Sequence, residues 1–217
     1  MAIDTDLHAG VAIFFKLDIN PNIQMEILSK GGFKAATQRI ITREIAPGMA
    51  IGPSFVPIAE TENATIEYNG ERYLLRLATS LNKIHKVSEK VSSAFEKSGY
   101  PFSEMVRYCE FNFPDQSLEI PDLINKIRSM ITVHTAGVLS SIFGVELEPY
   151  SFSLSYPETP LTDQWMHVTF TPESNNPENR VILKITKRTP TYDEMLDFLL
   201  DIESKIENIK DLFKEKI

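Results

Sequence analysis

Few residues in this chain of 217 could perform nucleophilic or acid–base chemistry, and their surroundings decide whether they would. The single cysteine, Cys109, lies in the middle of a segment with strand character. A nucleophilic cysteine needs a thiol pKa lowered by a helix N-terminus or a cation, and Arg107 is the one cation beside it in the sequence. A small buried thiol is therefore favoured over a catalytic one.

The four histidines offer no metal-binding spacing; they are His8, His85, His134 and His167. None of them forms an HxH, HxxxH or HExxH pattern, which argues against a zinc site. The sequence also lacks a GxSxG elbow, a Walker A loop, a GxGxxG turn and an EF-hand loop. We therefore predict no metal and no cofactor. A cysteine- or histidine-dependent enzyme is the least favoured hypothesis.

Residues 72–77 and 180–185 match in residue class along their length, and both have strand character. If the two strands are equivalent, one sheet face carries Arg76, Lys184, Thr186 and Arg188. A cationic row of this kind can hold an anion. The favoured alternative is a set of ordinary solvated positions whose charges are offset by nearby acids.

The charge of the chain narrows the classes of partner. The net charge is −8; residues 1–100 hold 11 basic and 11 acidic side chains, and residues 101–217 hold 11 and 19. An acidic half disfavours nucleic acid and anionic membranes, because both are bound through lysine and arginine. No apolar run approaches the length of a membrane span, and the first six residues carry two acids and no basic cluster. A cytoplasmic protein is expected.

Strands and helices alternate along the sequence. In the first half the pattern predicts a strand at 11–19, a helix at 21–30, a hairpin at 65–77 and a helix at 81–97. Asn69 and Gly70 indicate a two-residue type I′ turn in that hairpin, because both tolerate positive φ. The second half adds a strand at 105–113, a helix at 121–143, strands at 150–156, 165–171 and 180–185, and a final helix from 191.

These elements predict an α+β fold in which long amphipathic helices pack on one face of antiparallel sheet. Residues 1–100 and 101–217 form two α+β halves of one compact unit. Each half has the order strand, helix, three strands, helix, which indicates an internal duplication. The alternative is that α+β proteins often place a hairpin before a helix, since no fixed repeat period holds across both halves.

The final helix carries the clearest pattern in the chain. It begins with a capping box, because Thr191 can cap the helix and Glu194 can reach back. Its apolar residues are spaced three and four apart, and we predict that a partner binds Met195, Leu199, Ile202, Ile206, Ile209 and Phe213. Packing of the same stripe on the chain's own sheet is the equally weighted alternative. The leading hypothesis is a soluble, non-enzymatic binding or regulatory protein that forms a homodimer or docks a protein partner through this helix.

A second hypothesis rests on residues 46–57, an apolar stretch with three prolines and two glycines that should form no regular element. Such a loop can cover a pocket. We therefore consider a carrier of a small apolar ligand, held between sheet and helices and gated by this loop. The predicted ligand-binding residues are Met49, Ile51, Phe55 and Trp165.

Overall fold

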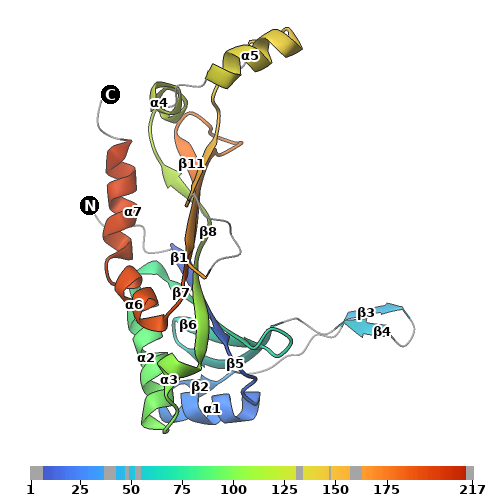
Figure 1. The fold of residues 1–217 in the computed structure, drawn as a ribbon, viewed down its shortest axis with the longest axis vertical. Helices are drawn as coiled ribbons and strands as arrows, with labels where there is room; N and C mark the ends of the chain where they lie inside the picture. The colour runs from blue at the N-terminus through green and yellow to red at the C-terminus, as the bar shows by residue number, and fades with distance from the viewer. Residues whose placement is uncertain are drawn as a thin grey trace.

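The structure is a computed structural model that describes residues 7–36, 43–46, 49–51, 55–130, 134–146, 148–156 and 163–213. A nine-stranded antiparallel sheet forms its frame (Figure 1). From one edge to the other, the strands are β2 (Lys34–Ala35), β5 (Val56–Thr61), β6 (Ala64–Asn69), β7 (Leu74–Ser80), β1 (His8–Phe15), β8 (Val106–Glu119), β11 (Arg180–Thr189), β10 (Trp165–Pro172) and β9 (Phe152–Ser155). A separate two-stranded sheet joins β3 (Arg43–Ala46) to β4 (Met49–Ile51).

The helices complete the predicted α+β class. They are α1 (Pro21–Lys30), α2 (Ile84–Lys97) after the 3-10 turn η1 (Leu81–Lys83), α3 (Phe102–Met105), α4 (Leu123–Met130), α5 (His134–Phe143), α6 (Tyr192–Leu200) and α7 (Ile202–Leu212). In Figure 1, α2, α6 and α7 lie on the same side of the sheet. The expected packing of long helices on one face is therefore present.

The centre of the sheet is the pairing of β1 with β8, and the order of strands is mirrored about it. Beyond β1 come β7, β6 and β5, and beyond β8 come β11, β10 and β9. In each half the first strand pairs with the last strand of that half, because β1 pairs with β7 and β8 pairs with β11. The sheet is continuous across the boundary between residues 1–100 and 101–217.

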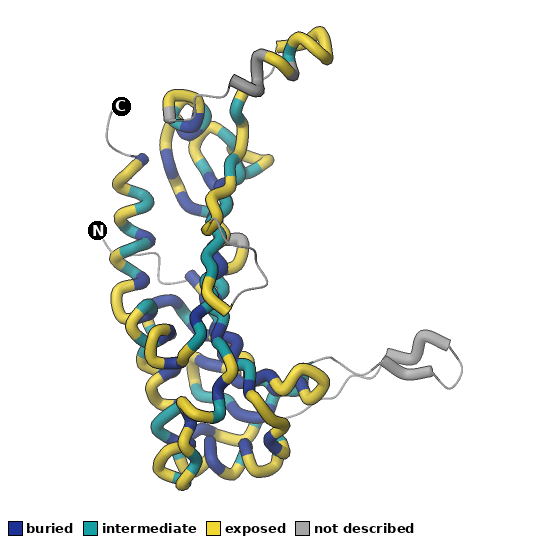
Figure 2. The backbone as a smooth tube through the Cα atoms, viewed as in Figure 1, coloured by how far each residue is buried: buried dark blue, intermediate teal, exposed yellow. Residues whose placement is uncertain are grey.

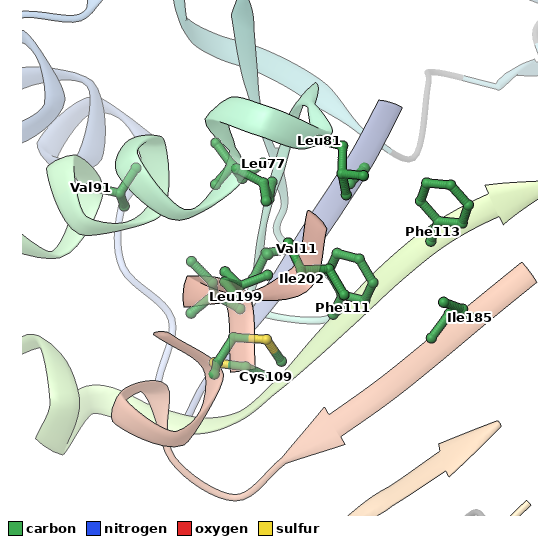
Figure 3. Packing of buried hydrophobic residues seen from close by; sticks show 14 of the residues in the cluster. Val11, Leu77, Leu81, Val91, Cys109, Phe111, Phe113, Ile185, Leu199 and Ile202 are labelled. Carbon is green, nitrogen blue, oxygen red and sulfur yellow. The ribbon is translucent and has the colours of Figure 1, made fainter. Parts of the chain in front are cut away.

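Successive side chains of the central strands point to opposite faces of the sheet, and one of these faces is the core side. In β1, Val11, Ile13 and Phe15 are buried in the hydrophobic core, and their neighbours point to the other face. In β8, Phe111 and Phe113 lie on the same core side. Figure 3 shows Val11 and Phe111 beside Leu199 and Ile202 of the covering helices.

The β6–β7 hairpin forms where Asn69 and Gly70 predict it, but its turn is longer than the predicted two residues. Asn69 pairs with Leu74 across the hairpin, so residues 70–73 form the turn. The Asn69 side chain accepts a hydrogen bond of 3.1 Å from the backbone N–H of Arg72. Tyr73, with φ of 50°, takes the left-handed conformation in this turn.

The predicted C-terminal helix is interrupted at Asp201, where φ is −121° and ψ is 20°. Leu199 and Ile202, on either side of the break, are both buried. Because α6 and α7 run in different directions in Figure 1, the break lets both helices keep their apolar sides against the core. Thr191 caps α6 as predicted, since its hydroxyl oxygen accepts a hydrogen bond from the N–H of Glu194.

The single helix predicted at 121–143 is also described as two, α4 and α5, with residues 131–133 outside the described ones. Leu123 and Ile127 of α4 are buried in the core. In contrast, Val138 and Ile142 of α5 are exposed. Figure 1 shows α5 extending away from the sheet, and Figure 2 colours its described residues mainly as exposed.

Candidate functional site

The apolar stripe of the C-terminal helices packs inside the chain. Five of its six residues are at most 2% exposed and the sixth, Ile209, is partly buried; the five are Met195, Leu199, Ile202, Ile206 and Phe213. Figure 3 shows Leu199 and Ile202 beside the core residues of β1 and β8. The stripe therefore has no open surface for a partner while these helices stay on the sheet, and internal packing accounts for its spacing.

The four residues predicted to bind an apolar ligand lie apart. Met49 and Ile51 form β4, a regular strand, so the prediction of an irregular loop is wrong for them. Phe55 lies under the Arg76 guanidinium, 4.4 Å from ring centroid to Cζ, whereas Trp165 lies beside Arg188. Since β1 and β8 separate β7 from β11, three strand spacings of about 4.8 Å place these two clusters about 14 Å apart.

Aromatic side chains of the sheet contact those of the covering helices. Phe15 packs on Phe95 and Phe102, with ring centroids 6.2 and 5.9 Å apart. Phe111 meets Phe198 of α6 at 5.3 Å. These ring contacts, which join the sheet to the helices α2, α3 and α6, give the carrier hypothesis no support from the core.

The opposite side, here called the helix-free face, carries an ordered row of side chains across six strands. Cross-strand partners share a face, and the register aligns Glu67, Arg76, Ala12, Glu110, Arg188 and Trp165 in that order. The register also places Lys184 and Thr186 on this face, which confirms the predicted shared face of the four polar residues. Both arginines pair with a carboxylate on the neighbouring strand, as the alternative of charges offset by acids expects.

Arg188 is the centre of the most densely organised group on this face. Its Nη2 donates to Glu110 Oε2 at 2.8 Å, and its Cζ lies 4.8 Å from the Tyr108 ring and 5.4 Å from the Trp165 ring. Tyr108 in turn stacks on Phe14, with centroids 4.2 Å apart. Burial raises the pKa of Tyr108, and the nearby Arg188 opposes that rise. This ladder of three rings and one guanidinium crosses β1, β8, β11 and β10.

A pocket of about 660 Å³ opens at the end of this ladder, where the turn at residues 70–73 meets the end of β1 and the start of β8. We call it the β1–β8 pocket. Its charged lining residues are Lys16, Glu71, Arg72, Arg107, Glu110 and Arg188. Its aromatic lining residues include Phe14, Tyr73 and Tyr108. The volume falls within the usual range for small-ligand sites.

One histidine has hydroxyl partners that resemble part of a catalytic arrangement. The Ser155 hydroxyl lies 2.8 Å from His167 Nδ1, and the Thr169 hydroxyl lies 3.0 Å from His167 Nε2. In a serine hydrolase a carboxylate orients the histidine, and here a threonine hydroxyl occupies that place. Both hydroxyls lie on the helix-free face of β9 and β10, so the arrangement is one hydrogen-bonded row of a sheet surface and gives no support for acyl transfer.

Cys109 is fully buried on the core side of β8, and burial raises the pKa of its thiol well above the ordinary value. The thiolate that nucleophilic catalysis requires is therefore disfavoured at neutral pH. Among the described residues, no group of three or more histidine, cysteine or acidic side chains could hold a metal ion.

The large exposed hydrophobic side chains of the described chain are concentrated in and around α5 and β9. Of the twelve large exposed hydrophobic side chains in the described chain, seven lie between residues 138 and 156. They are Val138, Ile142, Phe143, Val145, Tyr150, Leu154 and Tyr156. We call the described residues between 138 and 156 the exposed apolar segment.

One indirect signal for this segment is present in the sequence. Val138 and Ile142 continue the apolar spacing of residues 123–131, which predicts burial for all of them if one straight helix covers the sheet. The described helix α4 follows that expectation, and α5 does not. Several exposed apolar side chains on a helix that extends from the body are typical of an interaction site.

A scan of protein-family models and a search of curated protein sequences each found no match to this chain. Among its described helices, none has both the length and the apolar character needed to cross a membrane. The candidate sites therefore rest on geometry alone. They are the exposed apolar segment and the β1–β8 pocket.

Proposed function

We propose that the chain is a non-enzymatic docking protein that binds a protein partner through the exposed apolar segment between residues 138 and 156. The observation that carries the proposal is the concentration of exposed apolar side chains there, with Ile142 and Phe143 each 67% exposed. Soluble domains rarely leave such side chains clustered in water without a binding role. This surface takes the place of the C-terminal helix stripe, which is occupied internally.

The shape of the segment supports docking over a random scatter of exposed residues. Helix α5 extends from the body (Figure 1), so a partner can approach it from several sides. The adjoining strand β9 is the last strand of the sheet, and an edge strand offers unpaired backbone groups to a partner strand. Helix α5 can therefore offer apolar contacts to a partner, and the edge strand β9 can offer directional hydrogen bonds.

The expected energy is in the range of a specific complex. Fully burying a large aliphatic or aromatic side chain contributes about 1.5–3 kcal/mol, so a side chain that is half to two-thirds exposed gains about 1–2 kcal/mol on docking. Four such residues, Val138, Ile142, Phe143 and Val145, would dominate the interface in the way that hot-spot residues do.

Substitution of one exposed side chain tests the proposal. Complexes of the tagged chain are isolated from its native cells, and their mass is measured by light scattering for Ile142→Asp and for Leu200→Asp. Leu200, 71% exposed on α6, is the matched control. We expect Ile142→Asp to lose the complex and Leu200→Asp to keep it. Equal retention by both variants would refute the proposal.

The mass of the complex also identifies the class of partner. Twice the mass of the chain, which is 24.6 kDa without the tag, would indicate a homodimer, and a mass that is no multiple of the chain mass would indicate a different protein. The same segment would serve both, because an apolar helix and an edge strand can pair with themselves or with another chain. With one buried thiol and no disulfide, a reducing compartment such as the cytoplasm is the proposed location.

We also propose that the two halves arose by duplication. The mirrored strand order about β1 and β8, and the presence of a helix after β7 (α2) and after β11 (α6), support this proposal. On this account, α1 and α4 occupy corresponding places after the central strands. Superposition of β1, β7 and α2 on β8, β11 and α6 with a small Cα deviation is the expected result, and a different helix direction over the two halves would contradict it.

A further inference from the structure

Four segments line the β1–β8 pocket, and backbone hydrogen bonds join three of them at the end of β1. The N–H of Phe15 donates to the carbonyl of Tyr73 at 2.9 Å, which fixes the turn at residues 70–73 to the end of β1. The N–H of Lys16 donates to the carbonyl of Met105 at 2.9 Å, which fixes the same end of β1 to the start of β8. The pocket is thus built from paired strand ends, and it is distant in sequence from the exposed apolar segment.

The charge of the pocket is opposite to that of the chain. Its lining holds four cationic side chains and two carboxylates, whereas the whole chain carries −8. Glu110 is neutralised by Arg188, and the Lys16 ammonium donates to the carbonyl of Glu104 at 2.7 Å. Within the described part of the chain, no carboxylate forms an ion pair with Arg72 or Arg107.

The aromatic residues that line the pocket favour a ligand with a planar ring. Phe14 and Tyr108 stack with an interplanar angle of 22°, and Arg188 covers the Tyr108 ring. Tyr73, which is 42% exposed and has the left-handed conformation in the turn at residues 70–73, also lines the pocket. A ring bound between these residues would extend the existing ladder of stacked groups.

We propose that the β1–β8 pocket binds a small planar aromatic anion. Its ring packs against Phe14 and Tyr73, and its phosphate or carboxylate receives charge-assisted hydrogen bonds from Arg72 and Arg107. A guanidinium presents parallel N–H donors that match the oxygens of both groups. This site goes beyond the proposed docking function, because it uses other residues at another place on the sheet.

Titration with 1-naphthyl phosphate tests the proposal, since this probe combines a flat ring with a phosphate. Inorganic phosphate and 1-naphthol test the two parts alone, and 1-naphthoate replaces the phosphate by a carboxylate. Binding to the full chain is measured by calorimetry at low ionic strength. The amide shifts of residues 14, 73 and 108 are followed by NMR to locate the probe.

Four variants separate a specific site from a general charge effect. Arg72→Gln and Arg107→Gln each remove a proposed contact, and each should weaken binding about tenfold. Glu71→Gln removes a carboxylate from the same pocket and should tighten binding. Lys184→Gln removes one positive charge from an exposed position of the same sheet face, outside the pocket, and should leave the affinity within about twofold.

The expected result is saturable binding of one molecule of 1-naphthyl phosphate. Inorganic phosphate and 1-naphthol should each bind more weakly than this probe. Stronger binding of 1-naphthoate than of 1-naphthyl phosphate would assign the site to carboxylates, and the reverse order to phosphates. No saturable binding of either probe at millimolar concentration would overturn the proposal. Equal losses in Arg72→Gln, Arg107→Gln and Lys184→Gln would also overturn it, because attraction would then depend only on total charge.

Discussion

Replacement of Ile206 by alanine probes the internal packing of the C-terminal helices. The Ile206 side chain on α7 is fully buried, and the change removes three carbon atoms. At about 0.8 kcal/mol for each carbon, the lost burial is about 2.4 kcal/mol, and the cavity left behind raises the cost to about 3–4 kcal/mol. Leu200→Ala is the control, because Leu200 is 71% exposed and its truncation should cost less than about 0.5 kcal/mol.

Urea unfolding measures this difference when it is followed both by circular dichroism and by fluorescence of the single tryptophan. With an m-value of about 2 kcal/mol/M, Ile206→Ala should lower the urea midpoint by about 1.5–2 M at unchanged m. A partner interface along the stripe makes a different prediction, because the midpoint would then rise with protein concentration. A cost for Ile206→Ala as small as that for Leu200→Ala would refute the packing described here.

Three further predictions concern single side chains. Burial raises the pKa of the Cys109 thiol, so a thiol reagent at pH about 7.5 should modify it only in denaturant, and rapid labelling of the native chain would contradict its burial. Hydrogen bonds from Ser117 and Arg180 lower the pKa of Glu173, so its contribution to stability is present at neutral pH and is lost as the pH falls below the unfolded carboxyl pKa of about 4.3. Glu173→Gln should therefore destabilise the chain at neutral pH, and this effect should disappear as the pH falls through the lowered pKa of the folded state, as thermal melts can measure. The buried Tyr192 hydroxyl donates to a backbone carbonyl of α2 at 2.8 Å, so Tyr192→Phe should cost about 1 kcal/mol in urea unfolding, and a neutral change would contradict that bond.

Local patterns predicted most elements of the fold because they report which side chains must leave water. The strand at 11–19, the hairpin at 65–77 and the helix at 81–97 all have counterparts in the structure, with shifted ends. The nine-stranded order was not accessible from the sequence, because strand pairing depends on contacts between distant segments. The four-residue turn after Asn69 shows the same limit, since a hydrogen bond between Phe15 and Tyr73 holds that turn.

Helix continuity was the weakest part of the prediction. The spacing of apolar residues predicts which side of a helix is buried. It does not predict whether the helix continues straight or is interrupted. The break at Asp201 and the separation of α4 from α5 both occur within apolar patterns that read as uninterrupted. The candidate sites were missed for the same reason: exposure of Ile142, and the meeting of Arg72 with Arg107, both follow from three-dimensional arrangement.

The most direct test of the central claim is photo-crosslinking from the exposed apolar segment in native cells. A benzophenone side chain is placed at position 143 in one variant and at position 200 in another, because both native side chains are strongly exposed. The docking account predicts one discrete crosslinked product from position 143 and none from position 200. Equal yields from the two positions, or no product from position 143, would contradict it.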